Sequence, residues 1–289
     1  MAAFLSGGTG ASGTLAAKVD SLRSILTRLD RVVVAFSGGA DSAFLAWMAH
    51  HVLGKNSAIC VTAVSPSLAM SELDDCRALA VEWGLCWETV STREMERPEY
   101  VRNGTDRCFH CKSELMAAVG PLAAGNAATV VLGVNLDDLG DHRPGQAAAL
   151  GDGACFPLVE AGFTKAEVRE ASRDLGLRTW AKPAAACLSS RVPYGTPVTV
   201  DVLGRVGDAE AALRSLGFGQ VRVRHYRNSA RVELEIGEMA RAVELRTTIV
   251  SAVKSAGYDY VTLDLEGFRS GNLNGEHAQP IGIDVEADR

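Results

Sequence analysis

The sequence has no apolar run near the roughly 18 residues that a membrane-spanning helix needs; the longest, residues 43–49, ends at His50. Residues 1–15 carry no positive charge before a short apolar patch, so we expect a Gly/Ser-rich arm there and not a signal peptide. Basic residues are in slight deficit, since 29 Lys and Arg against 35 Asp and Glu give a formal net charge of −6. A protein that binds nucleic acid non-specifically needs a basic surface, so the acidic balance argues against such a function. We therefore expect a cytoplasmic protein with neither a membrane nor a nucleic acid as partner.

Cysteine, in contrast, is abundant for a chain without an export signal. The seven are Cys60, Cys76, Cys86, Cys108, Cys111, Cys155 and Cys187. An odd number without secretion argues against a disulfide framework and predicts reduced thiols. Because free cysteine buries readily, we predict that Cys60, Cys76 and Cys86, which lie in apolar patterns, are packing residues. The pattern leaves the role of Cys155 open.

The first two-thirds of the chain alternates between strand and helix patterns. A β-branched run at 31–36 predicts a buried parallel strand, and a Gly-rich turn and an apolar helix at 43–53 follow it. The cycle repeats with strands near 58–64, 87–90 and 129–132, and with helices near 71–83, where Ser71 is a candidate cap, and 112–119. This alternation predicts an α/β fold, a doubly wound parallel sheet.

A second, smaller α+β domain is predicted after a Gly/Pro-punctuated stretch at 182–197. One amphipathic helix, 161–175, precedes that stretch. Helices at 200–216 and 239–256 and strands at 220–225, 230–236 and 260–265 follow it. The predicted organisation is a flexible arm (1–14), a nucleotide domain (15–195), a substrate or oligomerisation domain (196–275) and a loose tail (276–289).

The strongest local signal is a phosphate loop between the first strand and the first apolar helix. Gly38 and Gly39 let the backbone approach a phosphate, and the helix N-terminus directs its N–H groups at the anion. Ser37 and Ser42 add hydroxyl donors, and Asp41 can hold a Mg²⁺ that bridges phosphates. The lysine of the common GxxxxGK[ST] loop is absent, so this is a different nucleotide loop.

A second polar loop, residues 132–145, leaves a predicted strand where ligands bind in doubly wound sheets, at the carboxyl edge. We predict that Gly133 and Asn135 contact ATP. Asp138 can hold Mg²⁺ or ribose hydroxyls, and Arg143 a phosphate or carboxylate. A solvated acidic loop is the alternative interpretation.

Cys187 lies between Lys182 and Arg191 in an irregular loop. Nearby cations lower a thiol pKa and favour the reactive thiolate, whereas a core cysteine more usually lies inside a strand or helix. Cys187 is therefore a candidate nucleophile. Lys182, Ser190 and Arg191 are candidates for binding a phosphate or offsetting charge on a developing oxyanion.

Residues 221–227 alternate apolar and basic side chains, which places Arg222 and Arg224 on one face of a strand. An exposed strand face, an anion site for a substrate phosphate and a subunit interface are all compatible with this pattern. Arg231, Glu233 and Glu235 share one side of the next strand, so charge pairing across the hairpin can explain some of these arginines. Arg269 is a second phosphate candidate.

These motifs carry a resemblance to a known family. Residues 36–42 match the pyrophosphate loop of the adenine-nucleotide α-hydrolase (PP-loop) superfamily, which includes NAD synthetases, GMP synthetases and tRNA thiolation enzymes. With residues 132–145, the Cys187-Leu-Ser-Ser-Arg191 motif and the late Gly267-Phe-Arg-Ser-Gly271, the chain from about 15 to 274 resembles the ATP-dependent sacrificial sulfur transferase (LarE) family of nickel-pincer cofactor synthesis, which serves lactate racemase maturation.

The resemblance implies a reaction and its cofactors. With ATP and Mg²⁺, such an enzyme adenylates a carboxylate of pyridinium-3,5-dicarboxylate mononucleotide, and a cysteine thiolate attacks the mixed anhydride. Breaking the Cβ–S bond leaves a thiocarboxylate and dehydroalanine, and Cys187 stands at the sulfur-donor position. Family members assemble as oligomers, so we also expect a homo-oligomer.

Cys108-Phe-His-Cys111 opens a predicted helix, so its two thiols lie about one turn apart. A redox dithiol is one interpretation. A structural zinc would need four ligands, and His110 or Cys155 would have to complete them. With Cys187 the two thiolates can instead hold a [4Fe-4S] cluster that leaves one iron open. The resemblance allows such a cluster to carry a replaceable sulfur; inert thiols remain an alternative.

Two other functions remain open at this stage. The first is a tRNA thiolation enzyme of the same superfamily. The three cysteines favour this function, whereas the acidic net charge and the lack of an RNA-binding appendage argue against it. A non-catalytic ATP-binding module that senses nucleotide or iron is the second alternative.

Overall fold

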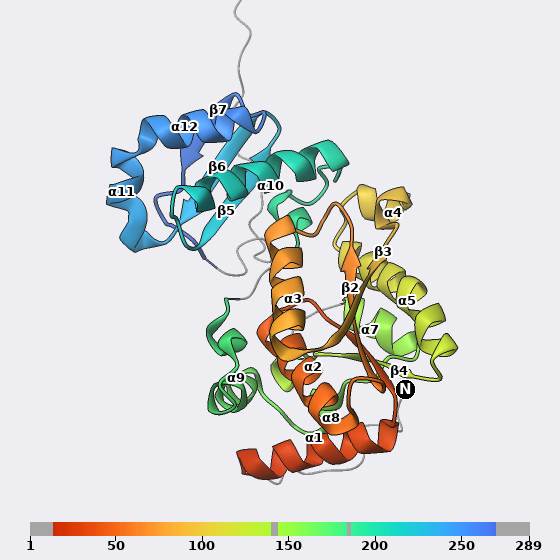
Figure 1. Cartoon of the computed structure of the whole chain (residues 1–289). Helices are drawn as coiled ribbons and strands as arrows, with labels where there is room; N and C mark the ends of the chain where they lie inside the picture. The colour runs from red at the N-terminus through yellow and green to blue at the C-terminus, as the bar shows by residue number, and fades with distance from the viewer. Residues whose placement is uncertain (1–13, 140–143, 184–185, 270–289) are drawn as a thin grey trace, which may run out of the picture. The chain divides into compact units, whose positions relative to one another are not determined.

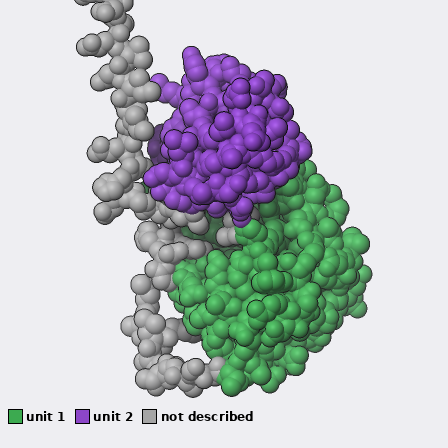
Figure 2. Space-filling view, turned by 90° about the vertical axis from the view of Figure 1, so that its left-hand side faces the viewer, with its two compact units in different colours: residues 1–100, 105–185 green, residues 101–104, 186–289 purple. Residues whose placement is uncertain are grey.

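The computed structural model describes residues 14–139, 144–183 and 186–269 (Figure 1). The chain divides into two compact units, one of residues 1–100 and 105–185 and the other of residues 101–104 and 186–289 (Figure 2). Contacts define these units but not their roles, so the predicted domains at 15–195 and 196–275 stay predictions. The predicted arm, apart from Thr14, and the predicted tail lie outside the described residues.

The first unit contains a parallel sheet with strand order β3-β2-β1-β4. Its strands are β1 (Val32–Ala35), β2 (Ala58–Val64), β3 (Cys86–Ser91) and β4 (Thr129–Leu132). β1 lies between β2 and β4, and it is buried because both faces of a parallel sheet are covered. The chain moves from β1 to β2 on one side and later to β4 on the other, so the carboxyl end of β1 is the point where the strand order reverses. The predicted α/β parallel sheet is confirmed.

Helices cover both faces of this sheet (Figure 1). One core contains residues of α1 (Leu15–Leu29), α2 (Ala40–Leu53), α3 (Met70–Trp83) and α9 (Lys165–Asp174). The other contains residues of α5 (Arg107–Gly125) and α7 (Pro144–Gly151). Val32 and Val34 belong to the first core and Val33 to the second, as alternation along a strand requires. None of the described helices has the length and apolar character needed to cross a membrane.

Four helix predictions need correction. The helix predicted at 161–175 begins only at Lys165, as α9, because Gly162 adopts φ +77° and Thr164 caps α9 in a capping box; a separate short helix, α8 (Pro157–Glu160), precedes it. Ser71 caps nothing: the N-cap of α3 is Ala69. The helix predicted at 112–119 begins earlier, at Arg107. The helix predicted at 239–256 divides at Leu245 into α11 (Met239–Glu244) and α12 (Arg246–Ser255).

The second unit contains a three-stranded sheet of order β5-β6-β7. β5 (Val221–Tyr226) and β6 (Ser229–Leu234) are antiparallel, and β7 (Tyr260–Leu263) runs parallel to β6. Alternate apolar residues of β5 and β6 form a core with α10 (Val200–Ser215) and α12. The remaining short elements are η1 (Glu94–Glu96), α4 (Pro98–Val101), α6 (Leu136–Leu139), η2 (Arg178–Ala181), η3 (Leu188–Arg191) and η4 (Ile236–Glu238).

Candidate functional site

The phosphate loop joins β1 to α2. Gly38 has φ +68°, a left-handed conformation that glycine adopts without steric cost. The hydroxyl of Ser42 lies inside the turn, where it accepts from the N–H of Ser37 at 3.2 Å and donates to the carbonyl of Gly39 at 3.2 Å. Among the described side chains none caps α2, whose N-cap is Gly39. The first N–H groups of α2 are therefore available to an anion.

The loop after β4 packs directly on the start of α2. A Cβ on Gly133 would lie 2.7 Å from the nitrogen of Ser42, so only glycine permits this approach. The fully buried Asn135 donates from Nδ2 to Oδ1 of Asp41 at 3.0 Å. The structure thus brings together Gly133, Asn135, Asp41 and Ser42, which the sequence places in two separate loops.

Asp41 and Asp138 form a carboxylate pair at this edge of the sheet. Burial raises the pKa of Asp41, the bond from Asn135 opposes that rise, and the charge of Asp138 adds to it. Asp138 accepts from the N–H of Asn135 at 3.3 Å. Within the described ranges no three His, Cys, Asp or Glu residues group as a metal site. Two carboxylates nevertheless fit Mg²⁺, which uses one or two of them together with substrate phosphates.

Two cations that no sequence motif singled out act on this pair. The charges of Lys165 and Arg169 lower the pKa of Asp41, so both act on the phosphate loop. The side chain of Asp137 fixes the start of α9 by accepting from the N–H of Lys165 at 2.7 Å. Arg169 donates from Nη2 to the carbonyl of Lys182 at 2.8 Å. Two features of the sequence could have identified them: a Thr-x-x-Glu capping box at the start of the helix, and cations at positions 165 and 169, four residues apart on one helix face.

Lys182 also lies at the phosphate loop, as its predicted role requires. Its Nζ is 3.6 Å from the position that a Cβ on Gly38 would occupy. The same Nζ donates to Glu72 at 2.8 Å and to Asp75 at 2.5 Å. Burial alone would lower the pKa of Lys182, but the bonds to Asp75 and Glu72 outweigh it and the pKa is raised. The ammonium therefore stays charged beside the loop.

The cysteine motif lies in the second unit, where Cys187 is the N-cap of η3. The side chain of Cys187 is exposed, whereas Leu188 and Arg191 are buried. Arg191 donates from Nε to the fully buried Glu210 at 2.8 Å and from Nη1 to the carbonyl of Cys187 at 3.2 Å. Arg191 therefore fixes the loop that presents the thiol, while its predicted contact with a phosphate stays a prediction.

The chain is similar to three curated proteins, and a family model described as NAD synthase matches residues 14–189. The pyridinium-3,5-bisthiocarboxylic acid mononucleotide synthase of Lactiplantibacillus plantarum is 39% identical over 263 residues, which is 90% of this chain and 95% of that protein. The chain belongs to the LarE family of PP-loop enzymes.

Two uncharacterized proteins are also similar to this LarE-family chain. The protein slr1717 of Synechocystis is 48% identical over 264 residues, 90% of this chain and 98% of that protein. The protein MJ0830 of Methanocaldococcus jannaschii is 24% identical over 241 residues, 83% of this chain and 91% of that protein. These matches extend beyond the first unit into the second.

In this LarE-family chain the basic strand is not an exposed strand face, since Arg222 is 7% and Arg224 2% exposed. Arg224 donates to Glu233 at 2.9 Å, which confirms the predicted pairing across the hairpin, and to the carbonyl of Ser190 at 3.1 Å. Burial lowers the pKa of Arg222 to about 10, and the charges of Arg224 and Arg191 add to that shift. A nearby anion would stabilise the charged form of Arg222.

Arg269, the other candidate for binding a phosphate, contacts the buried Arg222 through its backbone and not through its guanidinium. Its carbonyl accepts from Nη1 of Arg222 at 3.0 Å, and its guanidinium pairs with Glu266. The Nε of Arg222 is buried and has no hydrogen-bond partner within the described part of the chain. Arg143, the remaining candidate, lies outside the described residues.

The remaining cysteines of the LarE-family chain divide as follows. Burial raises the pKa of Cys60 to about 12 and of Cys76 to about 11, so both are packing thiols, as predicted. Cys86 is partly buried and packs against the other core, which also agrees with the prediction. Cys155 lies beside β4, with its N–H bonded to the carbonyl of residue 130 at 2.9 Å. Cys108 is exposed in the first turn of α5.

Proposed function

We propose that this LarE-family protein is an ATP-dependent sulfur transferase that converts a carboxylate of pyridinium-3,5-dicarboxylate mononucleotide to a thiocarboxylate, in nickel-pincer cofactor biosynthesis. The observation that carries the proposal is an exposed thiol, Cys187, on a loop fixed by a buried Arg191–Glu210 pair, in a chain that also has a phosphate loop. The similarity to the Lactiplantibacillus plantarum synthase supports the choice of substrate.

The first step activates the carboxylate. A carboxylate oxygen of the substrate attacks the α-phosphorus of ATP and pyrophosphate leaves, which turns that oxygen into part of a good leaving group. The N–H groups at the start of α2 would bind the phosphates, with Asp41 and Asp138 holding Mg²⁺. Lys165, Arg169 and Lys182 would offset the charge that develops on pyrophosphate.

The second step transfers sulfur. The thiolate of Cys187 attacks the acyl carbon of the mixed anhydride, and AMP leaves with the anhydride oxygen. A base then removes the Cα proton of residue 187, and the electron pair of the Cβ–S bond leaves with the sulfur. The products are a thiocarboxylate and a protein with dehydroalanine at position 187. Arg191 would keep the loop backbone in place while the thiol reacts.

The substrate carries a phosphate, and the buried cations of the second unit are the proposed partners for it. Arg222 and Arg224 are close enough for the charge of one to lower the pKa of the other. Ser190, Arg191 and Arg269 adjoin them through the contacts described above. A dianionic phosphate would offset the excess positive charge of this cluster.

A [4Fe-4S] cluster is the second candidate source of sulfur. Cys108, Cys111 and Cys187 would hold it through thiolates, and none of the three forms a disulfide, so the donor chemistry fits. When bound, the cluster would supply a replaceable sulfide, and Cys187 would serve as a ligand and not be consumed.

The decisive test combines a pyrophosphate-release assay with mass spectrometry of the intact protein after turnover. With ATP, Mg²⁺ and the pyridinium substrate, we expect pyrophosphate release, and Cys187→Ala should retain it while forming no thiocarboxylate. Loss of the mass of one H₂S from the protein would support the sacrificial route; an unchanged mass with about four irons per chain would support the cluster. Release with tRNA but not with the pyridinium substrate would favour RNA thiolation, and ATP binding without turnover would favour a sensor.

A further inference from the structure

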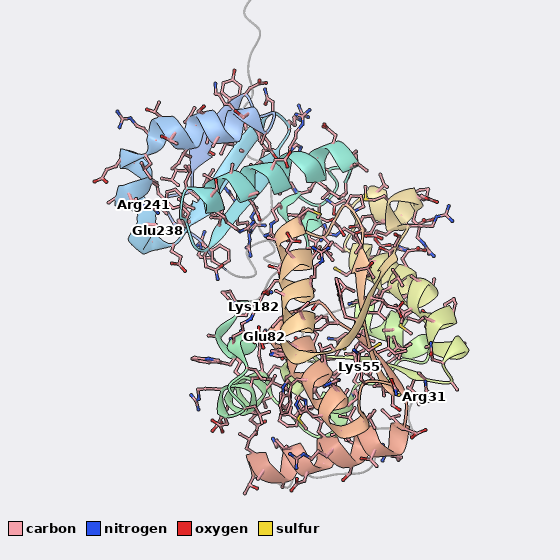
Figure 3. The ribbon with its side chains drawn as sticks, viewed as in Figure 1. Arg31, Lys55, Glu82, Lys182, Glu238 and Arg241 are labelled. Carbon is pink, nitrogen blue, oxygen red and sulfur yellow. The ribbon has the colours of Figure 1, made fainter. Side chains whose placement is uncertain are left out.

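One face of α3 carries a charged clamp against the phosphate loop. We define the clamp as Glu72, Asp75 and Lys182. Lys182 lies beside α3, to which Glu82 also belongs (Figure 3). Nζ of Lys182 is 2.8 Å from Oε2 of Glu72 and 2.5 Å from Oδ2 of Asp75. Cys76 lies on the same helix face, 2.9 Å from the Cβ position of Gly38, so this part of α3 packs directly under the loop.

The two carboxylates of the clamp are held differently. Asp75 is fixed from a second side, because Arg178 lies 2.8 Å from its other oxygen, Oδ1. Within the described part of the chain, the side chain of Glu72 has a hydrogen bond or ion pair only with Lys182. Asp75 is therefore sufficient to keep the Lys182 ammonium in position, and Glu72 adds a second negative charge that positioning does not require.

That second charge matters for a phosphate at Gly38. An ammonium has three N–H donors, so Lys182 can retain both carboxylates and still donate to a ligand oxygen. Its single positive charge, however, is shared with two negative charges less than 3 Å away. The clamp side chains are between 17% and 26% exposed, so solvent screens these charges incompletely.

We propose that Glu72 is a counter-ion that limits how tightly Lys182 holds phosphate, so that the site binds ATP yet releases pyrophosphate. Asp75 is the positioning residue of the clamp and Glu72 the residue that sets affinity. This inference depends on the proposed function only in placing the phosphates of ATP at the loop. It concerns phosphate affinity and is independent of the sulfur source.

The test measures binding of Mg²⁺-pyrophosphate, ATP and adenosine to the full-length Glu72→Gln protein by calorimetry. We expect pyrophosphate and ATP to bind at least about threefold more tightly than to the wild type, because one negative charge near the phosphates is gone. The gain should shrink in high salt, and adenosine, which carries no phosphate, should bind with unchanged affinity. A purely structural role for Glu72 would weaken all three ligands alike.

Glu82→Gln is the matched control, since Glu82 lies on the same helix and pairs with Arg178 at 2.8 Å but not with Lys182. It should leave pyrophosphate affinity unchanged. In a Lys182→Met background, Glu72→Gln should bring little gain, since the ammonium that it unmasks is absent. Glu72→Ala removes the same charge should the Gln variant fail to fold.

Unchanged or weaker pyrophosphate binding by Glu72→Gln would overturn the inference while leaving the proposed function intact. A wild-type protein that binds neither ATP nor pyrophosphate would overturn both.

Discussion

The Nδ2 of Asn135 donates to Oδ1 of Asp41 at 3.0 Å, which ties the loop after β4 to the first turn of α2. The two residues are far apart in sequence, and they meet because β1 and β4 are neighbouring parallel strands that end at the same edge. The bond opposes the rise in the pKa of Asp41 that burial causes, so it favours the ionised form of that carboxylate.

Asn135→Ala should therefore weaken ATP binding in a pH-dependent way. Loss of the bond lets the pKa of Asp41 rise further, so the defect should be largest at low pH and partly recover as the pH rises. We also expect a loss of stability of about 1–3 kcal/mol, because a buried carboxylate loses a partner. ATP affinity from pH 5 to pH 8 measures the effect. Asn126→Ala is the control, since that side chain bonds only a helix carbonyl at 2.8 Å.

Gly133→Ala should abolish ATP binding and destabilise the first unit. Its Cβ would lie 2.7 Å from the nitrogen of Ser42 and 2.8 Å from the carbonyl carbon of Asp41, and backbone atoms cannot move aside as a flexible side chain can. Thermal unfolding and ATP titration test this. Gly120→Ala, inside α5 with nothing within 4 Å of its Cβ position, should be stabilising by up to about 1 kcal/mol. A tolerated Gly133→Ala would show that the two loops do not pack this closely.

Arg191→Ala should cost about 3–5 kcal/mol of unfolding free energy, because it leaves Glu210 buried without the more buried of its two cations. The loop should also loosen, so that the rate of alkylation of Cys187, followed by peptide mass spectrometry, changes. Arg214 pairs with the same Glu210 at 2.8 Å from a more exposed position. Arg214→Ala should therefore lose much less stability. Equal losses in the two variants would contradict the anchoring role of Arg191.

The stability of the second unit should fall as the pH drops below about 6.5. Burial lowers the pKa of His225 below its ordinary value of 6.5, and the charge of Arg205 adds to the shift. The unfolded chain then binds a proton that the folded chain resists, so stability is full above pH 6.5 and is lost progressively below it. Urea unfolding from pH 8 to pH 5 measures the slope. His225→Gln should reduce the slope of the unfolding free energy against pH, and an unchanged slope would contradict the prediction.

Much of the nucleotide domain could be predicted because its signals are local. The β-branched run at 32–35, the glycines after it and the apolar helix that follows specify a strand, a tight turn and a helix from neighbouring residues alone. Alternation of such units leaves few topologies besides a parallel sheet. Ser37, Gly38 and Asp41 were therefore identifiable as loop residues from the sequence.

Helix ends were predicted less well, because caps and left-handed glycines compete with periodicity. The apolar spacing of 161–175 continues across Gly162, yet its φ of +77° ends one helix before Thr164 begins the next. The helix predicted at 112–119 likewise begins earlier, at Arg107, so that Cys108 and Cys111 lie at the start of α5.

The alternation of strands and helices, the phosphate loop and the cysteine motif are visible in the sequence, since each depends on residues that are near one another along the chain. The partners of the charged side chains, in contrast, depend on the folded structure. Lys182 meets Glu72 across 110 residues of sequence, and Arg191 meets Glu210 from a different element. Burial of Arg222 and Arg224 likewise depends on what covers their face of the sheet. Ion pairs and burial depend on distances that long-range packing sets, and no local pattern encodes those distances.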